Sequence, residues 1–301
     1  MKLQQKFKDA RQLESCRFTK EIICEKKKAG KNREMAQYFW TKWRKEKAQR
    51  QKDIQLHEIE RCNLKDVPEQ DVLGSGVFGY CKKMLYRGHV VAVKFFNKTS
   101  LDAVKKEASM IHTFDNEGLP YIFGINVKSK PYFIVMECYG IDGRSITLAE
   151  AAKTSMFTSE RQWVDVLLAC AKAISQIHTK GYIHCDLKGD NIVINKVDKG
   201  FYPIVIDFGK MQKACEAKIK KLSTVEQEKY NKYHKHIAPE VAQGTHPPTK
   251  ASDIYAFGLV ISLICFYHKI ENLRLIAVTC INGTPERRHT IDQIIDQLQS
   301  L

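Results

Sequence analysis

The stretch GYIHCDLKGDNIVI, residues 181–194, decides how the rest of the chain is interpreted. It carries Asp186, Lys188 and Asn191 at spacings suited to phosphoryl transfer. Asp186 could orient an attacking hydroxyl and accept its proton, while Lys188 could neutralise the phosphoryl group in transit. Asn191 offers the hard carbonyl oxygen that Mg²⁺ prefers. The stretch alone leaves three interpretations open: a working phosphotransferase, a relic of one, or a chance match in a basic chain.

A glycine-rich segment, GSGVFG at 74–79, precedes this stretch by about a hundred residues. Its glycines allow a tight turn to lie close to phosphates and to offer backbone N–H groups to them. The residues on both sides favour strands, with the β-branched run HVVAVKFF following at 89–96. A dinucleotide-binding fold would require a helix directly after the glycines, so that fold is disfavoured.

Two further segments place charged residues at the ends of apolar strands. VAVK, 91–94, ends in Lys94, and an ammonium on a buried strand is costly unless an anion meets it. Glu107, on the helix expected next, could be that anion; the alternative is a surface lysine and a solvated glutamate. In VIDFGK, 205–210, Asp207 follows a β-branched strand as a second candidate metal ligand.

The chain divides into three regions of different character. Residues 1–60 hold 17 Lys or Arg against 9 Asp or Glu, and their apolar spacing predicts an amphipathic helix. A strand-rich region with one helix follows, and from about residue 140 the pattern becomes helical. In the second region the residues predict a helix begun by Ser100 and a hairpin around KSKP, 128–131.

Composition limits the classes of function. The chain has 301 residues, 44% hydrophobic and 28% charged, with a formal net charge of +15 that favours anionic partners. Its ten cysteines form no C-x-x-C pair, and the N-terminus has no apolar export signal, so we expect a cytoplasmic protein, with the nucleus as the alternative. The apolar run 254–267 is too short to cross a bilayer and predicts a buried helix, so no transmembrane segment is expected.

Six segments occur in a fixed order: GSGVFG, VAVK, HCDLKGDN, DFG, APE at 238–240 and SDIYAFG at 252–258. Together they resemble the signature set of the eukaryotic protein kinase superfamily. The resemblance covers roughly residues 70–299 and implies an α+β, two-lobed fold. We expect a basic helical extension at 1–66 and a kinase domain at 67–301, with a β-rich N-lobe at 67–139 containing one main helix and a helical C-lobe at 140–301.

The resemblance implies a role for each matching residue, with ATP and Mg²⁺ as cofactors and a protein as the substrate. Lys94 corresponds to the phosphate-anchoring lysine paired with Glu107, Asp186 to the catalytic base and Lys188 to the lysine on the transferred phosphate. Asn191 and Asp207 correspond to the metal ligands. Glu240 would pair with Arg288, and Asp253 would support the catalytic loop. The implied ATP-binding set is Leu73, Gly74, Ser75, Gly76, Val77, Phe78, Gly79, Cys81, Ala92, Lys94, Met136, Glu137, Tyr139 and Val193.

Cys185 stands where the family usually has the arginine of His-Arg-Asp. In the resemblance that arginine meets a phosphate on the activation loop, so its loss affects regulation before chemistry. Lys188 favours Ser/Thr substrates, with dual specificity as an alternative. The rival interpretation is a pseudokinase-type scaffold, and a third places the function in residues 1–60.

Two basic regions leave alternatives open. Residues 1–60 could bind a partner helix or an anionic surface, or pack their aromatic residues on the neighbouring domain; nucleic acid is disfavoured because no binding signature is present. Between Asp207 and Glu240 the chain carries eight lysines, and 216–236 is expected to be helical. That helix could inhibit the enzyme, select acidic or phosphorylated substrates, or simply be solvated.

Overall fold

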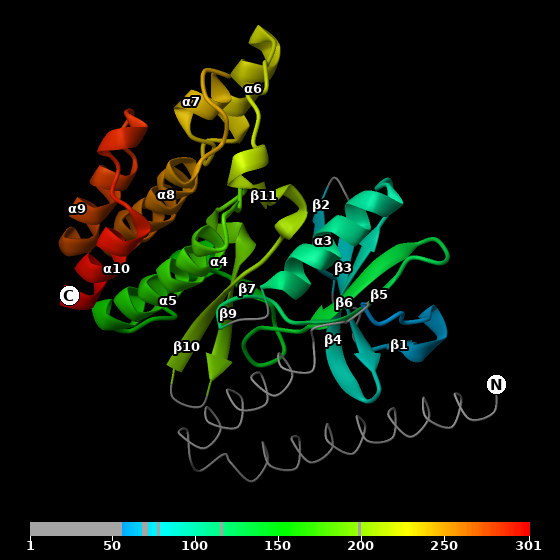
Figure 1. Ribbon diagram of the computed structural model, residues 1–301. Coiled ribbons are helices and arrows are strands. Elements are labelled where there is room, and N and C mark those ends of the chain that lie inside the picture. Colours follow the sequence, from blue (N-terminus) through cyan, green and yellow to red (C-terminus); the bar gives the residue numbers. More distant parts are fainter. Residues whose placement is uncertain (1–55, 68–71, 77–78, 115–116, 198–199) are drawn as a thin grey trace. The chain divides into compact units, whose positions relative to one another are not determined.

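A six-stranded antiparallel sheet forms the smaller lobe of the protein (Figure 1). The computed structural model describes residues 56–67, 72–76, 79–114, 117–197 and 200–301, and the expectations for residues 1–55 lie outside the described part. The strands run in the order β1-β3-β4-β6-β5, with β2 also pairing with β3. Their bounds are β1 Leu64–Asp66, β2 Val72–Gly76, β3 Gly79–Tyr86, β4 His89–Phe96, β5 Ile122–Asn126 and β6 Tyr132–Glu137.

The alternation of side chains along β4 sets the two faces of this sheet. Val91, Val93 and Phe95 are buried in a small core on one face. Because successive strand residues point to opposite faces, Lys94 projects from the other face together with Ala92 and Phe96. The residue pattern of one strand therefore directs a lysine toward the large lobe.

The helix α3, Leu101–Thr113, is the one main helix expected for this lobe. Ser100 caps it, and its side chain accepts a hydrogen bond from the Ala103 N–H at 3.3 Å. Its apolar side contributes Val104, Ala108 and Ile111 to the large hydrophobic core, and the same turns bury Glu107. Helix packing thus carries a carboxylate to the face where Lys94 lies.

Residues 56–66 contact the strands of the small lobe. Residues 56–301 form one compact unit. Ile59 is fully buried and donates its N–H to the Ile125 carbonyl, and β1 pairs with the end of β3. These few residues carry no strong strand pattern, so only their contacts with the sheet reveal where they belong.

Helices dominate the larger lobe, as expected, and the two-lobed α+β fold is confirmed. Figure 1 shows α5, α8, α9 and α10 gathered in this lobe, with the strands β9 and β10 beside them. The helices are α4 Leu148–Ala152, α5 Glu160–Thr179, α6 Thr224–Tyr233, α7 Pro239–Ala242, α8 Lys250–His268, α9 Glu271–Cys280 and α10 Ile291–Ser300. The strands are β7 Ile146–Thr147, β8 Tyr182–Ile183, β9 Ile192–Val197, β10 Gly200–Val205 and β11 Gln212–Lys213.

The apolar run at 254–267 forms most of α8. Within the described residues, α8 is the one helix long and apolar enough to cross a membrane by length and composition, and half of its most apolar window is buried inside the protein. Ile254, Phe257 and Ile261 lie in the core, and Asp253 is buried with them. A helix that is apolar on most sides is therefore explained here by its central position in the large lobe.

The lysine-rich segment, which lies between Asp207 and Glu240, is less helical than expected. Helix α6 covers only Thr224–Tyr233, whereas a helix over 216–236 was predicted. Ser223 begins it through a capping box with Glu226, and residues 217–222 lie outside any helix. The segment has no glycine or proline to break a helix, but α6 still does not extend upstream of Thr224. Ser223 caps the N-terminus of α6 and so sets where the helix begins.

The APE end of this segment, residues 238–240, is anchored by a buried ion pair, which the resemblance had implied. Arg288 donates to both carboxylate oxygens of Glu240 at 2.7 Å, and both side chains are at most 7% exposed. Arg288 also donates to the Ala251 carbonyl at 3.0 Å. The pair fixes α7 and α8 to the loop before α10.

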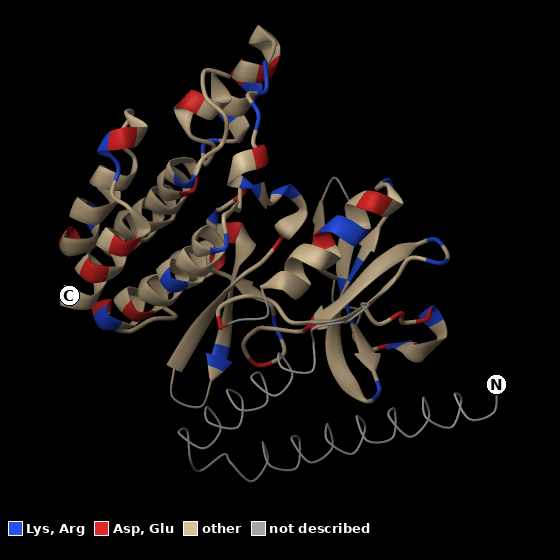
Figure 2. Ribbon diagram, in the orientation of Figure 1, with Lys and Arg blue, Asp and Glu red and all other residues tan. Residues whose placement is uncertain are grey.

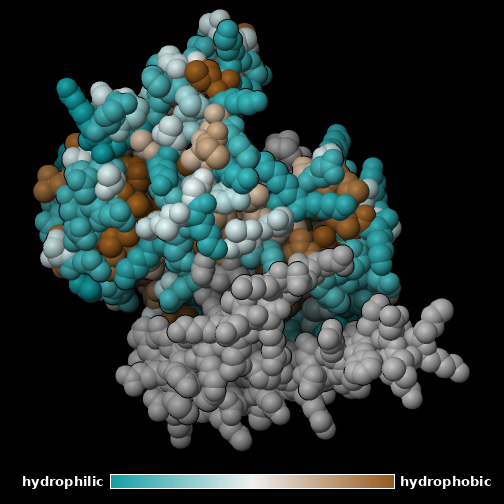
Figure 3. Space-filling model, viewed as in Figure 1, coloured by the Kyte–Doolittle hydropathy of each residue, from teal (hydrophilic) through white to brown (hydrophobic). Residues whose placement is uncertain are grey.

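Most of the surface is polar, but apolar side chains are exposed on the helices of the large lobe. Figure 3 shows them as brown areas within a largely teal face. Phe266 near the end of α8 and Leu275 and Val278 on α9 are among the exposed apolar side chains of the described residues.

We expect Arg288→Ala to lower the free energy of unfolding by about 3–5 kcal/mol, because it leaves the Glu240 carboxylate buried without its partner. Arg274→Ala is the matched control, since its pair with Glu271 is 67% and 77% exposed. That control should change stability by about 1 kcal/mol or less. Urea unfolding of both variants measures the difference, and equal effects would contradict the structural role assigned to Arg288.

Candidate functional site

Lys94 lies between two carboxylates that come from different lobes. Its Nζ donates to Glu107 Oε1 at 2.6 Å and to Asp207 Oδ1 at 2.8 Å. Glu107 is 6% exposed, Lys94 19% and Asp207 40%. The predicted Lys94–Glu107 pair is therefore present, and Asp207 joins it from the end of the strand that precedes DFG.

Lys94 and Asp207 favour each other's charged forms, whereas burial raises the pKa of Glu107 despite the nearby Lys94. Burial alone would lower the pKa of Lys94, but the Glu107 and Asp207 carboxylates raise it well above its ordinary value. Burial also opposes ionisation of Asp207, and Lys94 outweighs it, so that the pKa of this carboxyl is lowered. The Lys94 side chain is therefore protonated, and it lies beside an ionised Asp207 carboxylate.

The glycine-rich segment forms the hairpin between β2 and β3. Gly79 has a φ of +153°, and a Cβ there would lie 1.8 Å from the Phe95 carbonyl oxygen, so glycine is required. Gly74 and Gly76 face open space in which a Cβ would meet nothing within 4 Å. Leu73 is half-buried and Ser75 exposed on the same strand, and Val77 and Phe78 lie outside the described residues.

The residues expected around the adenine lie on both lobes. Ala92 pairs with Met136 across β4 and β6, and Cys81 pairs with Lys94 across β3 and β4. Val193 is buried on β9 of the large lobe, and Ala92 is buried on the sheet. The strand register thus aligns Ala92 with Met136, another member of the expected ATP-binding set.

Strand β6 ends at Glu137, where the chain passes toward the large lobe. The Tyr139 hydroxyl donates to Glu137 Oε2 at 3.1 Å and accepts from the Tyr121 N–H at 3.0 Å. These bonds turn the Tyr139 side chain back toward the sheet and fix the connecting segment.

The loop that carries Asp186 is held from below by the buried Asp253 of α8. Asp253 accepts hydrogen bonds from the N–H groups of His184 and Cys185 at 2.7 and 2.9 Å, and it lies 2.9 Å from His178 Nε2. Cys185 has the left-handed φ of 66°, which costs a non-glycine residue energy unless other bonds fix it. The support that the sequence assigned to Asp253 is therefore present.

His184 completes this support as a neutral imidazole. It is fully buried, and burial lowers its pKa. Its Nδ1 accepts from the Asp186 N–H at 3.3 Å, and its Nε2 donates to the Ile206 carbonyl at 3.2 Å. The ring links the loop of Asp186 to the strand that leads to Asp207.

The Asp186 carboxylate is bound by donors that sequence reasoning did not find. Lys210 Nζ donates to its Oδ1 at 2.7 Å, and His236 Nε2 donates to the same oxygen at 2.9 Å. Asn191 Nδ2 donates to Oδ2 at 3.2 Å, and Lys188 Nζ lies 3.7 Å from that oxygen. The excess of basic residues in 207–240 was the available signal, but it did not indicate which of them reach Asp186.

These donors keep Asp186 ionised. Burial opposes ionisation, but the hydrogen bonds from His236 and Lys210 hold the pKa of this carboxyl well below its usual range. A carboxylate with so low a pKa is a weak proton acceptor. Its suitable role in a reaction is to orient a hydroxyl rather than to remove a proton early.

Comparison with known proteins now identifies the fold family. The model of the protein kinase domain matches residues 68–274. The chain belongs to the protein kinase family. Calcium-dependent protein kinase 22 of Arabidopsis thaliana is 28% identical over 225 residues, which cover 70% of this chain and 43% of that protein. The probable serine/threonine-protein kinase gdt4 of Dictyostelium discoideum is 24% identical over 273 residues, covering 80% and 16%.

A third relative differs in its described specificity. The dual specificity testis-specific protein kinase 2 of Rattus norvegicus is 24% identical over 197 residues, which cover 64% of this chain and 33% of that protein. The chain therefore spans less than half the length of these curated relatives.

The protein kinase family implies ATP and Mg²⁺, and the donor chemistry of this site fits them. Mg²⁺ is usually held by one or two protein oxygens together with substrate phosphates and water. Asp207 supplies a carboxylate, and Asn191 binds Asp186 through its amide nitrogen, which leaves its amide oxygen for a cation. Among the described residues, no group of three or more His, Cys, Asp or Glu side chains is arranged to hold a metal ion by itself. The open space beside Gly74 and Gly76 is suited to phosphates.

The thiols of Cys81 and Cys185 near this site are held in their neutral form. Burial raises the pKa of the Cys81 thiol to about 12, and burial together with Asp253 raises the pKa of Cys185 to about 12. Gln212 also donates to the Cys185 sulfur at 3.3 Å.

Iodoacetamide at pH 8 should therefore modify the exposed Cys62 and Cys215 before Cys81 and Cys185. At that pH a thiol of pKa about 12 is ionised in about one molecule in ten thousand, and only the thiolate reacts. Peptide mass spectrometry over time measures the four labelling rates, and raising the pH should accelerate labelling of Cys81 and Cys185. Rapid early labelling of Cys81 would contradict this assignment.

Proposed function

We propose that this chain is an active protein kinase that transfers the γ-phosphoryl group of ATP to Ser or Thr hydroxyls in a Mg²⁺-dependent reaction. The observation that carries the proposal is the combination of Lys94 bound to Glu107 and Asp207 with Asp186 supported on the facing loop. Family membership supports the reaction type. The activity of the whole protein stays a proposal, because the chain covers a minor part of its relatives' length.

The proposed mechanism assigns each charged residue one task. Lys94 anchors the α- and β-phosphates, with Glu107 keeping its Nζ in place. Asn191 and Asp207 would hold Mg²⁺, which would neutralise negative charge on the phosphates of the nucleotide. Asp186 orients the substrate hydroxyl so that its oxygen attacks the γ-phosphorus. The bond to the β–γ bridging oxygen breaks and releases ADP, and the hydroxyl proton passes to Asp186 late in the transfer. Lys188 neutralises the phosphoryl group in transit.

The Ser/Thr preference rests on Lys188 and on the relatives. Lys188 Nζ lies 3.7 Å from Asp186 and is thus placed beside the expected position of the hydroxyl. Two of the relatives named above are called serine/threonine or calcium-dependent kinases and one dual specificity, so dual specificity is the second candidate.

An intracellular, reducing location is supported by the free thiols of the eight cysteines in the described part.

Cys185 concerns regulation in this proposal. Arginine is absent at this position, and the thiol instead accepts a hydrogen bond from Gln212. The loop keeps its shape through Asp253 and does not require a charge at residue 185. The rival proposal of a nucleotide-binding scaffold is opposed by the presence of Lys94, Asp186, Asn191 and Asp207 together.

The decisive experiment is transfer of radiolabelled phosphate from γ-labelled ATP with Mg²⁺, followed by phosphoamino-acid analysis. Wild-type protein should label Ser or Thr on itself or on a generic basic protein, and EDTA should abolish the signal. Asp186→Asn should lower the rate by about a hundredfold or more, the scale expected for loss of a positioned acid–base group. No transfer above the Asp186→Asn level, with nucleotide binding retained, would favour the scaffold.

His236 offers a second test of the same site. Its bond to Asp186 Oδ1 occupies an oxygen that the substrate hydroxyl needs, and Lys210 already binds that oxygen. We expect His236→Ala to raise kcat/KM about tenfold, since a hydrogen bond to a charged group contributes about 1.5–3 kcal/mol. His234→Ala is the matched control, because His234 is exposed and lies two positions before His236 in the chain. A fall in kcat/KM for His236→Ala would instead make His236 a residue that positions Asp186.

A further inference from the structure

A cavity of about 250 Å³ lies between the lysine-rich segment and the core of the large lobe. Cys185 and Gln212 border it on one side, and α6, through Tyr230, borders it on another. Ligand pockets for drug-sized molecules usually measure about 300–1,000 Å³, so this cavity suits a smaller group. It is separate from the glycine-rich segment and the Lys94 trio, none of whose residues line it.

The lining of this cavity is strongly cationic. Lys210, Lys218, Lys220 and His236 all border it. Among its lining residues the one carboxylate is Asp253, whose oxygens already bind the His184 and Cys185 N–H groups and His178. Figure 2 shows blue basic residues along the chain between β11 and α6. The charge of the cavity is therefore not neutralised by the groups that line it.

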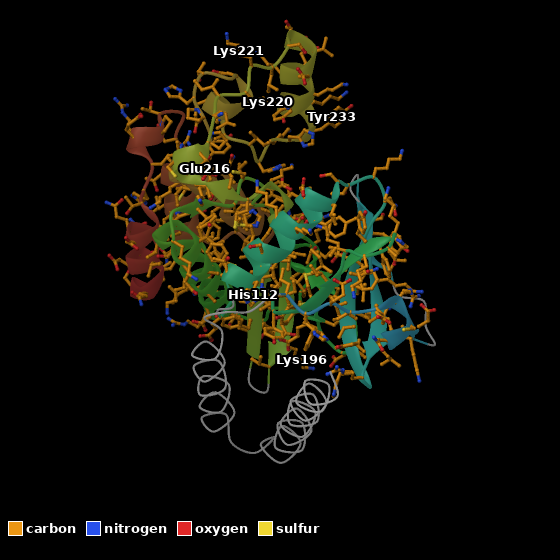
Figure 4. The ribbon with its side chains drawn as sticks, turned by 45° about the vertical axis from the view of Figure 1, so that its right-hand side comes forward. His112, Lys196, Glu216, Lys220, Lys221 and Tyr233 are labelled. Carbon is orange, nitrogen blue, oxygen red and sulfur yellow. The ribbon has the colours of Figure 1, made fainter. Side chains whose placement is uncertain are left out.

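Two of the lysines lack a carboxylate partner. Among the residues that the structure describes, Lys218 and Lys220 form no ion pair, and Lys220 Nζ lies 6.0 Å from the centre of the Tyr230 ring. Figure 4 labels Lys220 and Lys221 on the segment before α6. Glu226, the nearby acid of α6, is bound to the N–H and hydroxyl of Ser223 and does not line the cavity. Like charges gathered around a hollow favour a bound anion.

We propose that this cavity is a binding site for a phosphate monoester or inorganic phosphate, with Lys218 and Lys220 as its main ligands. Lys and Tyr side chains donate hydrogen bonds to phosphate oxygens, and Tyr230 is placed to add one. The site is distinct from the proposed nucleotide site and does not require phosphotransfer.

Two side chains connect this cavity to the Asp186 carboxylate. Lys210 and His236 both line the cavity and both bind Asp186 Oδ1. An anion in the cavity competes with Asp186 for these two donors. Occupancy of the site thereby loosens the contacts that hold Asp186 and couples anion binding to the catalytic loop.

The test is thermal unfolding of the full-length chain, first treated with phosphatase, in increasing inorganic phosphate against chloride at equal ionic strength. Phosphate should raise the Tm of the wild type, since a ligand that binds only the folded state stabilises it. The double variant K218E/K220E should need at least ten times more phosphate for the same shift. The control K229E/K232E makes the same charge change on exposed α6 lysines outside the cavity and should respond as the wild type does.

This design separates the cavity from other phosphate sites. Phosphate bound at the glycine-rich segment is common to all three proteins and leaves no difference among them. An equal response of all three proteins, or an equal loss in both double variants, would overturn the proposal. If K218E/K220E is unfolded in chloride, K218Q/K220Q becomes the test variant and K229Q/K232Q its control. The same outcomes then support or overturn the proposal.

One further arm identifies the source of the phosphoryl group. Protein that has not been treated with phosphatase is compared with treated protein, and its phosphorylated residues are located by mass spectrometry. Phosphate on Ser223, Thr224 or Tyr230, with a response to added phosphate only after treatment, assigns the group to this chain's own segment. An equal response before and after treatment assigns it to another molecule. Both results support the site.

Discussion

The partly buried ammonium of Lys94 is the constraint on which the functional part of this structure depends. A charge with so little access to water is stable only beside anions, and it has two, Glu107 from α3 and Asp207 from the DFG segment. Glu107 must therefore lie on the inner side of α3, and Asp207 must reach across from the large lobe. A single lysine thus relates the sheet, the helix and the DFG segment of this kinase domain.

A second buried charge organises the large lobe. Asp253 binds the N–H groups of two successive loop residues and so holds Cys185 in a left-handed conformation. This arrangement fixes the backbone of the catalytic loop without any contribution from the side chain at residue 185. It explains why Cys185 can stand where the family resemblance implies an arginine while Asp186 keeps its place.

The cations of the lysine-rich segment serve Asp186 and the cavity at once. Lys210 and His236 hold the carboxylate ionised, and they also complete a hollow lined by Lys218 and Lys220. Because both positions attract the same donors, the state of the segment and the freedom of Asp186 are linked by charge. Under the proposed anion site, regulation of this kinase would depend on what binds the segment rather than on a charge at residue 185.

The sequence by itself predicted a strand-rich region followed by a helical one, and the Ser100 cap, because local periodicity and capping residues encode such features directly. It offered the Lys94–Glu107 pair as one of two alternatives, and the family resemblance implied the two lobes and the Glu240–Arg288 pair. Only the tertiary structure decided that residues 56–66 join the sheet, that α6 begins at Ser223, and that Lys210 and His236 meet at Asp186. Those two donors lie 24 and 50 residues from Asp186 along the chain. Contacts over such separations depend on how the segment folds back, and no local pattern of lysines or histidines specifies that path.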